Sequence, residues 1–231
     1  SFFPYTTLFR SDDTLWAFSL NARDTYEEMY WKYEYNRFFD SFEHYYSLYH
    51  HRNLELWAEY ADGKVTKEEL NRQRYLYPLK AVGICDSALA KAYEKDALAA
   101  IPTKSKLMPH AREVLEYLSS KYNLYILSNG FKELQSHKMH SSGIDKYFKK
   151  IVLSDDIGVL KPWPEIFYFA LSATQSELKD SLMIGDSWEN DIAGAAGVGM
   201  HQVFYNLSGR MDLPFMPTYQ ISDLKELLDL L

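Results

Sequence analysis

The second half of the chain alternates short apolar runs with amphipathic segments, and this alternation constrains the fold more than any other feature. The runs at 124–127, 151–153 and 182–184 are continuously apolar, and each leads into small or polar residues. Continuous rather than alternating apolar character indicates strands that are buried on both faces, as in a parallel sheet covered by helices. The sequence therefore predicts an α/β fold with a Rossmann-like parallel sheet.

Between residues 22 and 100 the pattern is helical instead. Ser41 and Thr66 are placed to begin two helices, and Glu69 follows Thr66 at the spacing of a capping box. No run of β-branched residues typical of a strand occurs in this stretch. We therefore expect it to form a bundle of helices.

This helical stretch interrupts the strand pattern, which indicates an insertion. We expect an α/β core made of residues 1–16 and 104–231, with an all-helical domain at 17–103. Thirteen aromatic residues lie between Tyr26 and Tyr60. We interpret most of these rings as the core of the helix bundle, with stacking on a nucleotide base as the alternative for single rings.

The charge of the chain narrows the class of partner. Its 25 Lys and Arg against 32 Asp and Glu give a net charge of −7, which argues against nucleic acid polymers and anionic membranes. Cys85 is the single cysteine, so no internal disulfide can form. No apolar run approaches the roughly 18 residues that a membrane span requires. Because the first residues also lack the features of a signal peptide, we expect a cytoplasmic protein with a small-molecule partner.

Four polar clusters lie at or just after the expected strand ends, at 11–16, 128–129, 161–164 and 185–191. Ligands of open parallel sheets bind beyond the carboxyl ends of the strands, so the clusters are expected to converge. Carboxylates from the first and fourth would bind a hard divalent cation. A hydroxyl and a lysine would hold and neutralise a phosphoryl group. Each cluster alone fits a turn, a solvated lysine or a helix cap, but their order together predicts phosphate chemistry.

This ordered set resembles the haloacid dehalogenase (HAD) superfamily of hydrolases, from Asp12 to about Tyr205. Its motifs are hydrophobic-Asp-x-Asp-x-Thr, a strand ending in Ser or Thr, a Lys, and Gly-Asp-x-x-x-x-Asp. The segments 13–16, 128–130 and 182–186 are most similar to the pyrimidine 5′-nucleotidase branch of the phosphoglycolate-phosphatase-like subgroup, which carries a helical cap. The resemblance implies a Mg²⁺-dependent phosphatase that forms an aspartyl-phosphate and acts on a nucleoside 5′-monophosphate.

The resemblance also implies which residues handle the metal and the proton. Asp12 matches the second Asp of the first motif, which acts as general acid and then base. Its backbone carbonyl would also reach Mg²⁺. Asp186 would bind the metal directly, and Asp191 would support it.

Three further residues would bind the substrate phosphate. Ser128 would donate a hydrogen bond to the phosphoryl group that is transferred, with Asn129 beside it. Lys161 would neutralise charge on the phosphate and on the nucleophile. Specificity for the rest of the substrate would come from the helical cap.

Position 10 departs from the family pattern, because Arg10 stands where the nucleophilic Asp is expected. A guanidinium stays protonated and cannot attack phosphorus. It also replaces an anionic metal ligand with a cation, so metal binding by Asp186 and Asp191 should weaken. Asp13 is expected to project to the opposite face and is a poor substitute. With Arg10, we expect the chain to be impaired as a phosphatase.

Two explanations for Arg10 compete. The chain is either a pseudoenzyme that binds a phosphorylated ligand without turnover, or it carries a foreign start. Residues 2–11 resemble the translation of a widely used sequencing adapter, and the family-like sequence begins directly after them. We favour the second explanation and expect aspartate at position 10 in the natural protein. A 2-haloacid dehalogenase, which needs no metal, is a further alternative that the paired Asp186 and Asp191 argue against.

Overall fold

The computed structural model describes residues 6–231. The chain divides into two compact units. One unit comprises the chain up to Ser19 together with Lys104–Leu231, and the other comprises Leu20–Thr103. We call the first the α/β unit and the second the helical unit.

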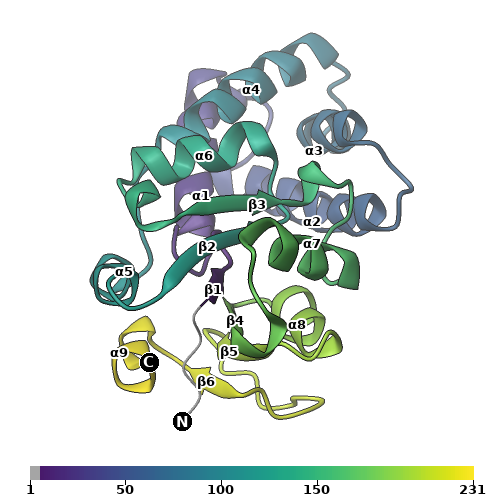
Figure 1. Ribbon diagram of the computed structural model, residues 1–231. Coiled ribbons are helices and arrows are strands. Elements are labelled where there is room, and N and C mark those ends of the chain that lie inside the picture. The colour runs from purple at the N-terminus through teal and green to yellow at the C-terminus, as the bar shows by residue number, and fades with distance from the viewer. Residues whose placement is uncertain (1–5) are drawn as a thin grey trace. The chain divides into compact units, whose positions relative to one another are not determined.

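The α/β unit is built on a parallel sheet, six-stranded within residues 6–231, in the order β3-β2-β1-β4-β5-β6 (Figure 1). All neighbouring strands in it run parallel. The prediction of a Rossmann-like parallel sheet is therefore confirmed. The strands are β1 Thr6–Phe9, β2 Asn123–Ser128, β3 Lys150–Leu153, β4 Ser181–Gly185, β5 His201–Tyr205 and β6 Tyr219–Ile221.

Strand β1 lies in the middle of this sheet, and its four residues are buried. Its last residue, Phe9, is in register with Ile126 of β2 and Ile184 of β4. The chain that leaves β1 therefore emerges between the carboxyl ends of two neighbouring strands. Of the segment 2–11, which we interpret as foreign, residues 2–5 lie outside the described residues.

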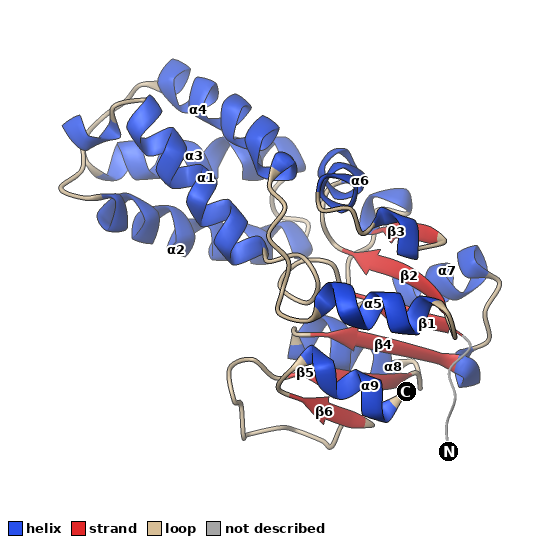
Figure 2. Cartoon of the chain, turned by 90° about the vertical axis from the view of Figure 1, so that its left-hand side faces the viewer, coloured by secondary structure: helices blue, strands red, loops and turns tan. Residues whose placement is uncertain are grey.

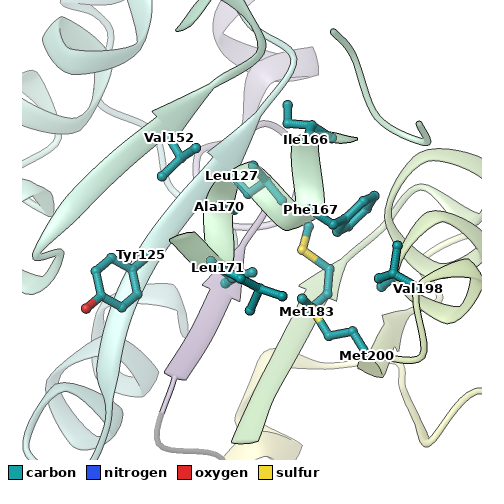
Figure 3. Close-up of a cluster of buried hydrophobic side chains, with 12 residues drawn as sticks. Tyr125, Leu127, Val152, Ile166, Phe167, Ala170, Leu171, Met183, Val198 and Met200 are labelled. Carbon is teal, nitrogen blue, oxygen red and sulfur yellow. The ribbon is translucent and has the colours of Figure 1, made fainter. Parts of the chain in front are cut away.

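Helices cover both faces of the sheet, with α5 and α9 on one face and α7 and α8 on the other (Figure 2). The α7 side is an apolar core in which Leu127 of β2 and Met183 of β4 pack with Phe167 (Figure 3). Burying these side chains excludes water beneath the strand ends. The helices of the unit are α5 Ala111–Ser119, α6 Lys132–Ser141, α7 Pro164–Thr174, α8 Gly194–Gly197 and α9 Leu227–Leu230.

The helical unit consists of helices joined by short turns, as the pattern of residues 22–100 predicts. Ser41 and Thr66 begin their helices as expected, because their side chains accept hydrogen bonds from the backbone N–H groups of His44 and Glu69, at 3.1 Å each. The helices are α1 Phe18–Lys32, which starts at the boundary of the unit, α2 Phe42–Ala61, α3 Lys67–Ala81 and α4 Ser87–Ala100.

Aromatic rings fill the interior of the helical unit. Tyr35 and Tyr93 stack with ring centroids 4.9 Å apart, and the hydroxyls of Tyr26 and Tyr49 lie within 2.6 Å of each other. Several of these rings are almost completely inaccessible to solvent, among them Tyr26, Tyr30, Tyr35, Tyr45, Tyr75 and Tyr93. A buried ring cannot stack on a base, so the interpretation of these rings as core is confirmed.

Candidate active site

The polar clusters predicted at the strand ends come together at one edge of the sheet. Ser128 is the last residue of β2, and Asp186 directly follows β4. Arg10 directly follows β1, and its backbone N–H donates to the carbonyl of Ile184 at 2.9 Å. The register of the three strands thus places residues 10–14 between Ser128 and Asp186.

Ser128 is buried, and its hydroxyl oxygen accepts hydrogen bonds from neighbouring donors. Gly130 donates its backbone N–H at 3.0 Å, and the Gln135 side-chain amide donates at 3.1 Å. A Cβ at position 130 would lie 1.9 Å from Gln135 Nε2 and would displace the end of the Gln135 side chain from Ser128. The Ser11 hydroxyl also lies 3.3 Å from the Ser128 hydroxyl, so three neighbouring groups hold Ser128 in place.

Asn129 holds the backbone of Lys161. Its side-chain oxygen accepts from the Lys161 backbone N–H at 2.8 Å, and its amide nitrogen donates to the Lys161 carbonyl at 3.0 Å. This two-point contact fixes the start of the segment 161–164 against the end of β2. Asn129 thus positions Lys161 in the structure, and its assignment to substrate binding stays a prediction.

Lys161 and Asp191 form a buried ion pair. The distance from Lys161 Nζ to Asp191 Oδ1 is 2.6 Å, and the two side chains are 2% and 0% exposed. Burial lowers the pKa of Lys161 from its ordinary value, although the carboxylate of Asp191 acts in the opposite direction. Asp191 packs against Gly185, where a Cβ would lie 2.3 Å from its Oδ2. The glycine of the fourth motif is thus required for the close approach of this carboxylate.

Arg10 turns its guanidinium toward the oxygens that the sequence assigns to the metal. Its Nε lies 3.1 Å from Asp186 Oδ1 and donates to the backbone carbonyl of Asp12 at 2.9 Å. Its Nη1 lies 3.4 Å from Asp191 Oδ2. Burial disfavours the charged form of Arg10, but the surrounding carboxylates outweigh it and raise the pKa of the guanidinium. Arg10 is therefore a permanent cation in the site.

Asp186 is held from two sides. Besides Arg10, the Thr14 hydroxyl donates to Asp186 Oδ1 at 2.7 Å. Burial raises the pKa of Asp186 above the ordinary carboxyl value, although the charge of Arg10 acts to lower it. Asp186 Oδ1 therefore has one hydrogen-bond donor, Thr14, and one cation beside it, Arg10.

Mg²⁺ does not fit this set of residues while Arg10 is present. The Asp12 carbonyl, Asp186 and Asp191 all face the guanidinium, and a divalent cation would meet a positive charge where it needs oxygen ligands. Within residues 6–231, no three His, Cys, Asp or Glu side chains are grouped so that they could hold a metal ion. The predicted site residues thus come together, but around an arginine.

Two residues of α6 complete the site, and the sequence does not predict them. Lys138 is buried, and its Nζ lies 3.1 Å from both carboxylate oxygens of Asp12. Gln135 donates to Asp12 Oδ2 at 3.2 Å. The ammonium of Lys138 also faces the rings of Trp16 and Phe18, with centroids at 4.9 and 5.1 Å. The available signal was a pair of polar residues at i and i+3 on a helix, which is ordinarily a solvated face.

Asp13 points its carboxylate elsewhere. Its two oxygens accept from the backbone N–H and the hydroxyl of Ser19, at 2.8 and 2.7 Å. The backbone φ of Asp13 is 56°, in the left-handed region that aspartate tolerates better than most residues. Asp13 thus holds the start of α1, which agrees with the expectation that it cannot replace the missing nucleophile.

Comparison with known proteins gives a consistent result. Residues 11–199 match the family described as haloacid dehalogenase-like hydrolase. The chain is 29% identical over 225 residues to the pyrimidine 5′-nucleotidase YjjG of Escherichia coli (strain K12), covering 96% of both. It is 31% identical over 182 residues to YfnB of Bacillus subtilis (strain 168), covering 78% of this chain and 76% of YfnB.

Solved structures agree with the fold. The crystal structure of YfnB bound to magnesium superposes with a TM-score of 0.87 at 26% identity, over 99% of this chain and 98% of that one. The L-2-haloacid dehalogenase of Xanthobacter autotrophicus superposes with a TM-score of 0.74, over 98% of both chains. At 17% identity this second likeness concerns the fold alone.

Proposed function

Because the chain belongs to the haloacid dehalogenase-like hydrolase family, we propose that its site is that of a phosphomonoester hydrolase acting on nucleoside 5′-monophosphates, with the nucleophile position taken by Arg10. One observation carries the proposal. Asp12, Ser128 and Lys161 come from three separate segments and meet, together with Asp186, at the carboxyl ends of β1, β2 and β4: Gln135 contacts both Asp12 and Ser128, Arg10 contacts the Asp12 carbonyl, Asp186 and Asp191, and Lys161 pairs with Asp191.

In this proposal the chain's own residues bind the phosphate and move a proton. Ser128 donates its O–H to a phosphoryl oxygen, and Lys161 neutralises charge beside it. Asp12 gives a proton to the oxygen of the leaving alcohol and later takes one from water. Lys138 and Gln135 hold the Asp12 carboxylate in one orientation for both steps.

The missing part is the nucleophile, which an aspartate at position 10 would supply. Such an aspartate would also free the oxygens of Asp186 and Asp191 for Mg²⁺, which assists family members by neutralising phosphoryl charge. We therefore propose that the hydrolase is Mg²⁺-dependent when position 10 is an aspartate and impaired when it is Arg10.

The substrate proposal rests on the nucleotidase YjjG and on the motif segments that resemble its branch. We propose a small phosphorylated metabolite as partner, the helical unit as the cap that selects it, and the cytoplasm as location. Among residues 6–231, no helix combines the length and apolar character needed to cross a membrane.

A phosphate-release assay tests the proposal. The chain with Arg10 and the Arg10→Asp variant are compared over nucleoside monophosphates, sugar phosphates and 2-haloacids, with Mg²⁺ or with chelator. We expect release only from nucleoside monophosphates by Arg10→Asp with Mg²⁺. Arg37→Asp makes the same charge change at an exposed arginine of the helical unit and should leave the chain inactive.

Each other outcome has a defined meaning. Equal phosphate release by both chains contradicts the nucleophile assignment. Preference for sugar phosphates removes the nucleotide while keeping the hydrolase, and halide release supports a dehalogenase instead.

A pseudoenzyme is the second candidate, because Arg10 is well accommodated by Asp186 and Asp191. An Arg codon at position 10 in clean genomic reads favours it. An Asp codon there favours the foreign start.

A further inference from the structure

We propose that the guanidinium of Arg10 takes the place of a divalent cation in this site. The chain with Arg10 then holds its acidic cluster together without metal and does not bind Mg²⁺ there. The inference concerns the binding of cations, not hydrolysis. It rests on the proposed assignment of the Asp12 carbonyl, Asp186 and Asp191 as metal ligands.

The contacts of Arg10 supply the first argument. The guanidinium joins three oxygens from two separate segments: the Asp12 carbonyl at 2.9 Å from the first, and Asp186 Oδ1 at 3.1 Å and Asp191 Oδ2 at 3.4 Å from the second. Contacts of an arginine at a strand end with one surface carboxylate would be ordinary. Convergence of all three predicted metal ligands on one planar cation indicates that it fills the position between them.

The charge of the site supplies the second argument. An aspartate and a divalent cation together contribute a single net positive charge, and arginine contributes the same charge alone. The remaining charges are balanced within the site, since Lys161 faces Asp191 and Lys138 faces Asp12. Replacing aspartate plus metal by Arg10 therefore leaves the electrostatic balance of the cluster unchanged.

Burial makes this balance necessary. Asp191 is completely buried, and the side chain of Asp186 is only 20% exposed. Lys161 already neutralises Asp191, so Asp186 is the carboxylate whose charge depends on Arg10, and water reaches it only in part. Removing the guanidinium without adding a carboxylate should therefore open a site for a metal ion.

The test measures cation binding directly. Mn²⁺ serves as the probe in electron paramagnetic resonance, where the free ion is counted, and Mg²⁺ is added in thermal unfolding. The proteins are the chain with Arg10, Arg10→Asp, Arg10→Ala and Arg10→Met, with Arg37→Ala as control at an exposed arginine. Arg10→Met keeps most of the side-chain length in case Arg10→Ala does not fold.

We expect the Arg10 chain and the Arg37→Ala control to leave Mn²⁺ free and to show no change of Tm with Mg²⁺. In chelator, Arg10→Ala or Arg10→Met should have a lower Tm than the Arg10 chain. Adding Mg²⁺ should restore part of this decrease in Tm. Both should bind Mn²⁺ at least tenfold more tightly than the Arg10 chain, and Arg10→Asp more tightly still. One equivalent of Mn²⁺ bound equally well by the Arg10 chain and Arg10→Asp would overturn the inference. No binding by any variant would also overturn it.

These outcomes separate the inference from the proposed hydrolase. If Arg10→Asp binds Mn²⁺ but releases no phosphate from any ester, the hydrolase fails and the role of Arg10 stands. If Arg10→Asp releases phosphate in chelator and binds no Mn²⁺, the hydrolase stands without its Mg²⁺ dependence, and the role of Arg10 fails.

Discussion

The two units bury cations in different ways. In the α/β unit, Lys161 faces the carboxylate of Asp191 at 2.6 Å, in a pair shielded from solvent. In the helical unit, the buried guanidinium of Arg74 donates to the amide oxygens of Asn53 and Asn71, at 3.4 and 2.5 Å. It also packs against a ring, with the Tyr75 centroid at 5.1 Å. Lys161 is thus neutralised by a carboxylate, whereas Arg74 is surrounded by neutral amides and a ring.

This difference indicates that the buried charges of the α/β unit serve the proposed active site, whereas the interior of the helical unit serves stability. A buried ion pair rarely stabilises a fold more than apolar side chains of the same size would, so its presence needs another reason. The strand ends of the α/β unit collect such pairs where phosphate would bind. The helical unit instead packs tyrosine rings, with Arg74 covered by amides. Removing the buried cation should therefore lower the free energy of unfolding by different amounts in the two units.

The largest effect is expected for Lys161→Met. It leaves Asp191 buried with only the more distant Arg10 as cation, so the free energy of unfolding should fall by about 3–5 kcal/mol. Arg74→Met leaves behind neutral amides, and we expect a change within about 1–3 kcal/mol. Urea unfolding of both variants measures the difference, with the exposed Lys179→Met as control.

If Lys161→Met and Arg74→Met lower the free energy of unfolding equally, the proposed difference between the two units is wrong. The double variant Lys161→Met/Asp191→Asn removes both charges and therefore tests whether the unpaired carboxylate of Asp191 causes the loss of stability. It should be more stable than Lys161→Met alone if the unpaired carboxylate causes the loss.

A smaller effect is expected for Lys138→Met, because Asp12 is partly exposed to water. We expect a loss of about 1–3 kcal/mol in the free energy of unfolding. In the Arg10→Asp form, kcat should fall about 10- to 100-fold, because Asp12 loses the group that orients it. Lys132→Met, at an exposed residue of the same helix, is the control. Unchanged kcat in Lys138→Met would mean that Lys138 does not orient Asp12.

The sequence predicts the core strands and the strand-end residues because their signals are local. Strand β4 combines continuous apolar character with a following Gly-Asp, and both features are visible within a few residues. Strand β6, Tyr219–Ile221, has three residues, and one of them is exposed. A segment this short shows no recognisable pattern of apolar residues in the sequence. The residues after β4 form a π-helical segment, Trp188–Ala193, and the Ser187 side chain caps it by accepting from the Asn190 backbone N–H.

The parts of the site that the sequence misses depend on distant contacts. Lys138 becomes a site residue only because α6 brings it to Asp12, which lies 126 positions away. The occupation of the metal position by Arg10 likewise depends on Asp186 and Asp191 reaching back to β1. The departure of Arg10 from the family pattern is predicted from the sequence, but the contacts of its guanidinium with the Asp12 carbonyl, Asp186 and Asp191 are seen only in the structure.

The smallest expected effect concerns Glu94 of α4, which is half-buried in the helical unit. Burial raises the pKa of Glu94 above its ordinary value of 4.5, and the nearby charge of Arg74 acts to lower it but does not outweigh burial. Because folding raises this pKa, the folded state binds the proton more tightly than the unfolded chain. The stabilisation is fully present below the ordinary pKa and is lost as the pH rises through the folded value.

Glu94→Gln should remove this dependence, since an amide resembles the protonated acid. In urea unfolding, the variant should be more stable than the parent at pH 7, by less than about 1 kcal/mol, and equal to it near pH 4. Glu68→Gln, at an exposed residue of α3, should show no such trend. A parent that is more stable than Glu94→Gln at pH 7 would mean that Arg74 and Glu94 act as an ion pair. The helical unit would then bury its cation as the α/β unit does, and the contrast between the two units would no longer hold.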